Sequence, residues 1–146
     1  MTELERLLAI EEIKRLVARR VRALDARDWE TYQACHAPEH VSDFFKDAGD
    51  RDAMMAALRA ETAGVTSIHH VYSPDIAIRS DEIASGSWTM EDRRYWLQDG
   101  DEHWLHGWGF YHETYACRDG AWLITSRRLE RTRVEHSPGS KRASST

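Results

Sequence analysis

The chain is poor in the features that mark secreted, membrane-spanning and zinc-binding proteins. It has only two cysteines, Cys35 and Cys117, which lie far apart and form neither a CxxC pair nor a Cys/His metal-ligand spacing. A disulfide framework and a zinc site are therefore not indicated. No stretch approaches the roughly 20 apolar residues of a membrane span, and the N-terminal residues are charged and amphipathic rather than a signal sequence. We expect an unprocessed, soluble protein of the reducing cytoplasm.

Several cofactor-binding and catalytic motifs are absent as well. The sequence has no glycine-rich phosphate loop, no dinucleotide-binding fingerprint and no GxSxG elbow, which disfavours nucleotide cofactors and serine-hydrolase chemistry. Its histidines form no HExxH pattern: His103 and His106 have an odd spacing on a predicted strand, and His36 and His40 flank a proline-containing loop. We therefore predict neither a metal nor another cofactor.

The length and the charge of the chain narrow the range of partners. A chain of 146 residues can bury one sizeable core, which indicates a single domain. Its formal net charge is −5, from 20 basic and 25 acidic residues without a block of like charges. This balance argues against nucleic acid or an anionic membrane as the main partner and favours small molecules or other proteins.

The residue pattern predicts helices followed by a long sheet, an α+β domain over residues 1–134. Helical periodicity and the capping residues Asp28 and Asp50 indicate helices at residues 2–24, 28–36 and 52–62. After residues 41–45, either a short strand or an irregular segment, four long strands are predicted: 66–79, 83–97, 103–118 and 121–134. Short turns join them into an antiparallel meander, and two of these turns carry the hairpin signal Asp-Gly, at Asp99-Gly100 and Asp119-Gly120. The helices should cover one face of this strongly curved sheet, which then encloses a pocket. Residues 135–146 are predicted to form a disordered tail.

One carboxylate interrupts the apolar face of the first helix. Asp25 lies four residues after Val21, on the stripe that carries the apolar side chains of this helix. A buried acid needs a proton, a hydrogen-bonding partner or a function that uses its altered pKa. The dipeptide His69-His70 offers such a partner.

An ordered set of short motifs resembles a known family over residues 3–134: Leu24-Asp25-Ala26-Arg27-Asp28-Trp29, His69-His70, Trp88-Thr89-Met90-Glu91-Asp92, Gly107 to Tyr115, and Asp119-Gly120-Ala121-Trp122. The chain resembles the nuclear transport factor 2-like superfamily and, within it, the SnoaL-like proteins. The resemblance implies a cone-shaped barrel. The superfamily includes polyketide cyclases, scytalone dehydratase, bile-acid dehydratase, hexachlorocyclohexane dehydrochlorinase and ketosteroid isomerase, alongside members that only bind ligands or partners.

The resemblance also implies a catalytic pair of an acid and a histidine. The dehydratase and dehydrochlorinase branches pair an acid at the end of the first helix with a histidine on the first long strand, and Asp25 with His69 or His70 matches those positions. Adjacent strand residues face opposite sides, so only one histidine can line the cavity. His70 is favoured, since its spacing to Pro74 and to residues 76–78 fits the family better. In the alternative interpretation, Asp25 caps its own loop and both histidines are structural.

Two strands supply further candidates. Asp92 shares a strand face with Trp88, Met90 and Arg94, and it is either a second proton-transfer group or the partner of an arginine. On the next strand Tyr111 and His112 face opposite sides, so only one can line the pocket. The remaining candidates for substrate binding are His69, Trp88, Met90, Gly109 and Arg20. Arg20 replaces a tyrosine common in the dehydratase-like relatives and is suited to an anionic group.

These candidates predict a cofactor-independent lyase or isomerase, of the dehydratase or cyclase kind. His70 would be the general base and Asp25 its orienting partner, while Tyr111 or Asp92 would stabilise an oxyanion or donate a proton. The tryptophans of the central strands favour a small apolar or aromatic ligand, such as a polyketide-like or steroid-like ring, and also a homodimer or a trimer. The rival hypothesis is a non-catalytic module of the same fold that binds a small ligand or a protein.

Overall fold

The computed structural model describes residues 1–45 and 47–141. Three α-helices, α1 (Glu3–Ala26), α2 (Trp29–Ala34) and α3 (Arg51–Thr62), precede most of the sheet. Each helix is preceded by an N-cap residue whose side-chain oxygen accepts a hydrogen bond from a backbone N–H of the first turn: Thr2, Asp28 and Asp50. The N-caps predicted at Asp28 and Asp50 are therefore confirmed. No helix among the described residues is long and apolar enough to cross a membrane.

Five strands form one sheet in the order β1-β5-β4-β3-β2. The four long strands are antiparallel neighbours, as predicted: β2 (Thr66–Ile78), β3 (Ile83–Gln98), β4 (Asp101–Arg118) and β5 (Ala121–His136). The first strand differs from the prediction. β1 covers His36–Ser42 and pairs with β5 in parallel, while Asp43–Phe45 is a 3-10 turn. The sheet is therefore mixed and not wholly antiparallel.

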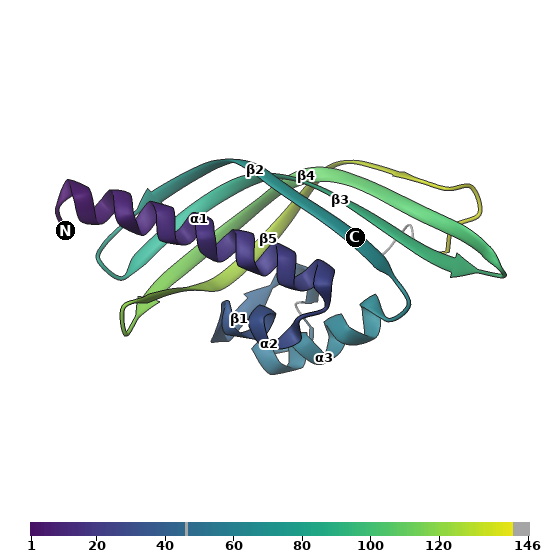
Figure 1. Ribbon diagram of the computed structural model, residues 1–146, viewed down its shortest axis with the longest axis horizontal. Helices are drawn as coiled ribbons and strands as arrows, with labels where there is room; N and C mark the ends of the chain where they lie inside the picture. The colour runs from purple at the N-terminus through teal and green to yellow at the C-terminus, as the bar shows by residue number, and fades with distance from the viewer. Residues whose placement is uncertain (46, 142–146) are drawn as a thin grey trace.

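The sheet curls around α1 without closing into a barrel. Figure 1 shows α1 lying along the concave side of the long strands, with α2, α3 and β1 gathered below its C-terminal end. β1 and β2 are the two edge strands, so the sheet stays open between them. The α+β class is confirmed, and the cone is curled rather than closed.

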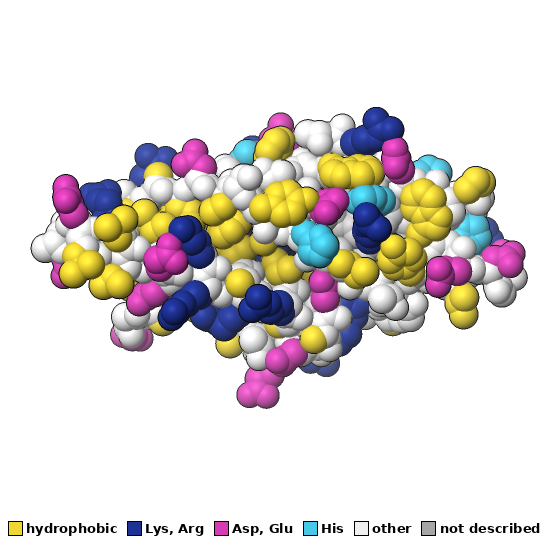
Figure 2. Space-filling model, turned by 45° about the horizontal axis from the view of Figure 1, so that its top comes forward, with side chains coloured by type: hydrophobic (Ala, Val, Ile, Leu, Met, Phe, Trp, Pro, Cys, Tyr) yellow, Lys and Arg dark blue, Asp and Glu magenta, His cyan; other side chains and the backbone are white. Residues whose placement is uncertain are grey.

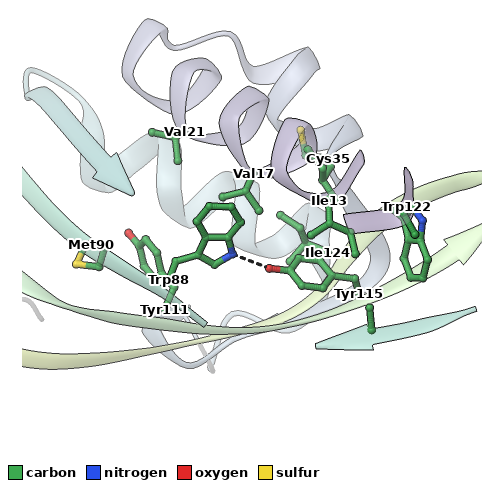
Figure 3. Packing of buried hydrophobic residues seen from close by; sticks show 13 residues of the cluster. Ile13, Val17, Val21, Cys35, Trp88, Met90, Tyr111, Tyr115, Trp122 and Ile124 are labelled. Carbon is green, nitrogen blue, oxygen red and sulfur yellow. Dashed lines mark hydrogen bonds between the residues drawn. The ribbon is translucent and has the colours of Figure 1, made fainter. Parts of the chain in front are cut away.

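The middle of α1 fills the concave side of the sheet with a packed core. Ile13 and Val17 lie against Trp88, Tyr115 and Ile124, all buried (Figure 3). The Trp88 indole N–H donates a hydrogen bond to the Tyr115 hydroxyl over 2.9 Å. A smaller apolar cluster surrounds the other end of the helix: Ala23, Leu24, Tyr32, Met54, Met55 and Leu58. The concave side beside the first of these clusters is therefore filled by side chains.

Two irregular features of the strands affect the site. The pairing of β2 with β3 shifts register between Tyr72 and Asp75, so β2 contains a bulge. At the other end of the sheet, β5 continues to His136 and the buried Ser137 donates its backbone N–H to Trp104 O over 2.9 Å. The first residues of the predicted tail are thus part of the folded sheet, and residues 142–146 of that tail lie outside the described residues.

Candidate active site

A hydrogen-bonded pair of Asp25 and His69 forms the centre of the site. Asp25 ends α1 and His69 lies on β2. The His69 ring Nδ1 is 2.6 Å from Asp25 Oδ1, and the His69 backbone N–H donates to Asp25 Oδ2 over 2.7 Å. The carboxylate thus holds both the ring and the backbone of its partner. The predicted meeting of Asp25 with a strand histidine is present in the structure.

The choice of His70 as the partner of Asp25 is wrong. The His70 side chain is 59% exposed, and its Nδ1 lies 3.3 Å from Glu91 Oε1 on the outer side of the sheet. The bulge in β2 explains the error. Ser67, His69 and Val71 face inward before it, whereas Ile76 and Ile78 face inward after it, so counting back from Ile76 selects the wrong histidine.

Neighbouring residues hold Asp25 in its ionised form. The Ser67 hydroxyl donates to Asp25 Oδ1 over 2.9 Å, and the Arg27 guanidinium donates to Ser67 Oγ over 2.8 Å. Burial alone would raise the pKa of Asp25, but hydrogen bonds from His69 and Ser67 and the charge interaction with His69 outweigh it and lower that pKa. An ionised carboxylate at Nδ1 holds the ring proton there, so in the neutral imidazole the lone pair is on Nε2.

His69 Nε2 faces a second carboxylate. It lies 4.0 Å from Asp92 Oδ2, and Asp92 is only 1% exposed. Arg131 binds both oxygens of Asp92, at 2.5 Å and 3.1 Å, and Arg94 approaches to 3.3 Å. Burial would raise the pKa of Asp92, but the two arginines and His69 lower it. Asp92 is therefore an ionised, arginine-bound carboxylate and is unsuited to donate a proton.

A glycine makes room for this ion pair. A Cβ atom built on Gly107 would lie 2.1 Å from Arg131 Nη1 and 2.7 Å from Asp92 Oδ1. Such distances are far below contact, so only glycine fits beside the pair as it stands. Gly107 faces Asp92 directly across the β3–β4 ladder.

Tyr111, and not His112, faces the concave side. Tyr111 is buried, and two guanidinium groups lie over its ring, that of Arg20 at 5.0 Å and that of Arg127 at 5.3 Å. Arg20 is itself buried and, like Tyr111, lines a hollow on the concave side, where its guanidinium group could meet an anionic ligand. His112 lies on the outer face, with its ring nitrogens 3.0 Å from Ser87 Oγ and 2.7 Å from Glu130 Oε2, so its placement in the pocket is wrong.

The other predicted substrate-binding residues do not line a cavity on the concave side. Trp88 belongs to the packed core (Figure 3), and Met90, 1% exposed, packs in the same cluster. Gly109 lies at a register shift of β4, where an added Cβ would meet the Glu130 carbonyl oxygen at 2.0 Å. Trp88 and Met90 therefore belong to the core, and Gly109 allows the close approach of β5, so these residues shape the sheet around the site.

Two adjoining hollows open at the C-terminal end of α1. Their empty volumes, which include open solvent, are ≈ 510 Å³ for the first and ≈ 520 Å³ for the second. The first is mainly apolar and includes Leu58, Val65, Trp96 and Leu105 in its wall. The second carries four arginines: Arg20, Arg94, Arg127 and Arg131. His69 lines both hollows, so the dyad lies where an apolar chamber meets a cationic one.

The outer face of the sheet carries a separate set of polar contacts. His106 Nε2 lies 3.0 Å from Glu91 Oε2, and the nearby Trp104 and Phe110 are each 38% exposed. Figure 2 shows hydrophobic and histidine side chains reaching the surface beside one another. These residues are separated from Asp25 by the thickness of the sheet, so the outer face is a different surface from the candidate site.

Sequence reasoning missed the residues that complete the site. Ser67 lies two residues before His69, and this spacing on a strand is a signal that would have placed it on the same face. Arg127 and Arg131 gave no signal, because the segment Arg127-Arg128-Leu129-Glu130-Arg131 is mostly charged and resembles a solvated strand. Phe44, which lines both hollows, lies in a segment without a clear periodicity.

Comparison with known proteins supports this arrangement of the chain. The model of the SnoaL-like domain matches residues 5–128. A scytalone dehydratase candidate from Novosphingobium aromaticivorans DSM 12444 has a similar structure, with 20% identity, coverage of 92% of this chain and 91% of that chain, and a TM-score of 0.80. A type 2 hexachlorocyclohexane dehydrochlorinase, LinA, gives 12% identity, 95% coverage of each chain and a TM-score of 0.83. A protein of unknown function from Mycobacterium tuberculosis gives 22% identity, coverage of 87% and 78%, and a TM-score of 0.71. At these identities the structures establish the shared fold, while the domain match covers nearly the whole chain, and the protein therefore belongs to the SnoaL-like family of the nuclear transport factor 2-like superfamily.

Proposed function

We propose that this protein is a cofactor-independent lyase or isomerase in which His69 is the general base and Asp25 orients it. The observation that carries the proposal is the 2.6 Å contact between His69 Nδ1 and Asp25 Oδ1 at the junction of two hollows. With its Nδ1 proton held by the carboxylate, the imidazole presents the Nε2 lone pair to a ligand. The family and its dehydratase-like and dehydrochlorinase-like structural neighbours favour this class of reaction.

The proposed step is removal of a proton from carbon. His69 Nε2 takes the proton, and the electron pair of the broken C–H bond forms a C=C bond. In a lyase the pair on a neighbouring bond leaves with a hydroxyl or halide group; in an isomerase a carbonyl oxygen takes up the charge and the proton returns to another carbon. The imidazolium then lies between Asp25 and Asp92, whose Oδ2 is 4.0 Å from Nε2, so two carboxylates stabilise the charge that forms.

Negative charge that develops on the substrate has its own stabilising groups. Tyr111 lines the cationic hollow with a phenol hydroxyl that can donate a hydrogen bond. The Arg20 and Arg127 guanidinium groups both lie over its ring and add positive charge close to it. Tyr111 thus has the role predicted for it from the sequence, which is to stabilise developing oxyanion charge. The arginine-bound Asp92, in contrast, acts only through its charge.

The test uses the compounds on which the structural neighbours are named to act. Purified protein is incubated with hexachlorocyclohexane, followed by chloride release, and with scytalone, followed by dehydration. The variants are Asp25→Asn and His69→Ala, and His70→Ala is the matched control, because it removes the adjacent histidine from the opposite face. Loss of a positioned general base lowers the turnover rate by roughly 10²- to 10⁴-fold.

We expect this loss for H69A and D25N and turnover close to wild type for H70A. Circular dichroism checks that each variant is folded, since Asp25 also accepts the backbone N–H of His69. Equal turnover by H69A and the wild-type protein would refute the proposal. Ligand binding without any turnover would instead support the non-catalytic module.

A further inference from the structure

Arg20 is a buried cation without a hydrogen-bonding partner for most of its guanidinium group. It lies on α1, is 2% exposed and lines the cationic hollow. Its Nε and Nη2 atoms are buried and have no hydrogen-bond partner among the described residues. Burial acts to lower the pKa of Arg20, but interactions with Tyr111, Tyr32 and Glu113 outweigh it and raise that pKa, so the group stays charged.

The carboxylates around the cationic hollow are already bound to other groups. Glu113 accepts hydrogen bonds from the Tyr115 hydroxyl and from Arg127 Nε, each over 3.0 Å. Asp92 is held by Arg131 and Arg94. Asp43 accepts the backbone N–H of Leu129 through both oxygens, at 3.1 Å and 3.2 Å. Arg20 is therefore the one cation of this hollow that pairs directly with no carboxylate among the described residues.

The buried, unpaired charge of Arg20 lowers the stability of the folded protein unless another interaction compensates for it. A buried charge without a paired opposite charge loses its hydration and gains little in return. The Tyr111 ring, 5.0 Å from the Arg20 guanidinium carbon, offsets part of this cost through a cation–π contact but supplies no oxygen acceptor to Nε and Nη2. An anionic ligand in the hollow that Arg20 lines would supply the opposite charge that this guanidinium group lacks.

We propose that Arg20 is the binding site for a carboxylate group of the substrate. The proposal rests on the proposed function and names the substrate class: a small compound with an apolar ring at one end and a carboxylate at the other. The apolar part occupies the hollow walled by Leu58, Trp96 and Leu105, and the carboxylate occupies the cationic one.

The positions of Arg20 and Asp25 on α1 set the distance between the bound carboxylate and the reacting carbon of the substrate. Arg20 precedes Asp25 by five residues, which corresponds to about 7.5 Å along a helix axis. A carboxylate at Arg20 therefore places the reacting carbon, near His69, several bonds away. This spacing suits a ring with the carboxylate and the acidic C–H on different sides.

The experiment measures binding, and it does not require turnover. Isothermal titration of benzoate and of the neutral benzamide is carried out on the wild-type protein, on Arg20→Met and on Arg22→Met. Arg22 is an exposed arginine two residues further along α1, so Arg22→Met makes the same change of charge outside the hollow. The same titrations on Asp25→Asn separate this proposal from the proposed function, because D25N disables the dyad and keeps Arg20.

We expect benzoate to bind at least tenfold more tightly than benzamide to the wild-type protein. Removing a charge-assisted hydrogen-bond donor in R20M should weaken benzoate binding by about 10- to 100-fold and leave benzamide binding nearly unchanged. R22M and D25N should bind benzoate like the wild-type protein. Arg20→Lys, which keeps the charge but not the planar fork, should give an intermediate affinity and serves as a second variant if R20M does not fold.

Three results would overturn the proposal. These are the absence of benzoate binding to the wild-type protein, equal affinities for benzoate and benzamide, and equal benzoate affinities of the wild-type protein and the Arg20 variants. A dyad that fails the turnover test while R20M loses benzoate binding would leave the carboxylate site intact in a non-catalytic binding protein.

Discussion

Two buried histidines of β1 should make the protein sensitive to mild acid. His36 is 1% exposed and His40 is fully buried, with their rings 4.6 Å apart. His36 Nδ1 lies 2.7 Å from Tyr32 O and His40 Nδ1 lies 3.0 Å from Ile124 O. In each ring Nδ1 therefore carries the proton that the backbone carbonyl accepts, and the ring is neutral.

Both histidines resist protonation in the folded protein. Burial, followed by the charge of Arg127, lowers the pKa of His40 to about 3, and the same two causes lower the pKa of His36 far below its ordinary value. In the unfolded chain both return to the ordinary value of 6.5. Since the unfolded chain binds protons first, the stability that depends on these neutral rings is fully present above pH 6.5 and declines as the pH falls toward 3.

The size of the effect follows from the linkage relation. Each buried histidine contributes up to about 1.4 kcal/mol of lost stability per pH unit below its unfolded pKa. At a pH of about 5 the loss is roughly 2 kcal/mol per histidine and roughly 4 kcal/mol for the pair. This loss is a large part of the total unfolding free energy of a domain, which is typically about 5–15 kcal/mol. A loss of this size is readily measured.

The assay is urea denaturation at several pH values from neutral to about 5, which stays above the ordinary pKa of Asp and Glu side chains. The double variant His36→Asn/His40→Asn is compared with the wild-type protein, because an asparagine amide can donate to a carbonyl as Nδ1 does but does not titrate. His70→Asn controls for the loss of a histidine as such. The unfolding free energy of the double variant should depend much less on pH in this window. An equal dependence in the double variant and the wild-type protein would refute the reasoning.

Two further predictions concern packing at the site and in the core. Gly107→Ala and Arg131→Gln should each destabilise the protein by about 3 kcal/mol in urea denaturation, because both break the buried ion pair between Arg131 and Asp92. The double variant should be little less stable than either single variant, since both changes remove the same interaction. Additive losses of stability would show that Gly107 acts independently of the ion pair. Trp88→Phe should cost about 2 kcal/mol in thermal or urea unfolding, because it removes the hydrogen bond to the buried Tyr115 hydroxyl and part of the ring volume; an unchanged stability would contradict this role of the indole N–H.

Local signals in the sequence were sufficient for most of the fold. The two Asp-Gly turns occur where predicted, with positive φ at Asp99, Gly100, Asp119 and Gly120, as the tight hairpin requires. β1 could not be recognised, because His36–Ser42 contains Pro38 and buries two histidines, a composition typical of a loop. Its pairing with β5 depends on tertiary contacts that no local pattern encodes.

The candidate site was predictable in its chemistry but not in its register. The position of Asp25 on the apolar stripe correctly indicated a partner for the carboxylate. The identity of the histidine depended on the bulge between Tyr72 and Asp75, which reverses the inward and outward alternation along β2. The role of Arg131 could not be predicted for a different reason. Its ion pair with Asp92 joins β5 to β3, which are not adjacent in the sheet, and passes over Gly107 of β4 between them.

The way α1 lies along the edge strand β2 also bears on how the protein avoids aggregation. An edge strand exposes backbone groups to which a strand of another molecule can add. Here Asp25 accepts the backbone N–H of His69, Arg27 donates to the Val65 carbonyl and Arg6 donates to the Ile78 carbonyl over 3.2 Å. Between these contacts the bulge beside Pro74 interrupts the strand, and proline offers no N–H to a neighbour. The proposed catalytic carboxylate thus also blocks a hydrogen-bonding position through which identical chains would otherwise assemble into larger sheets.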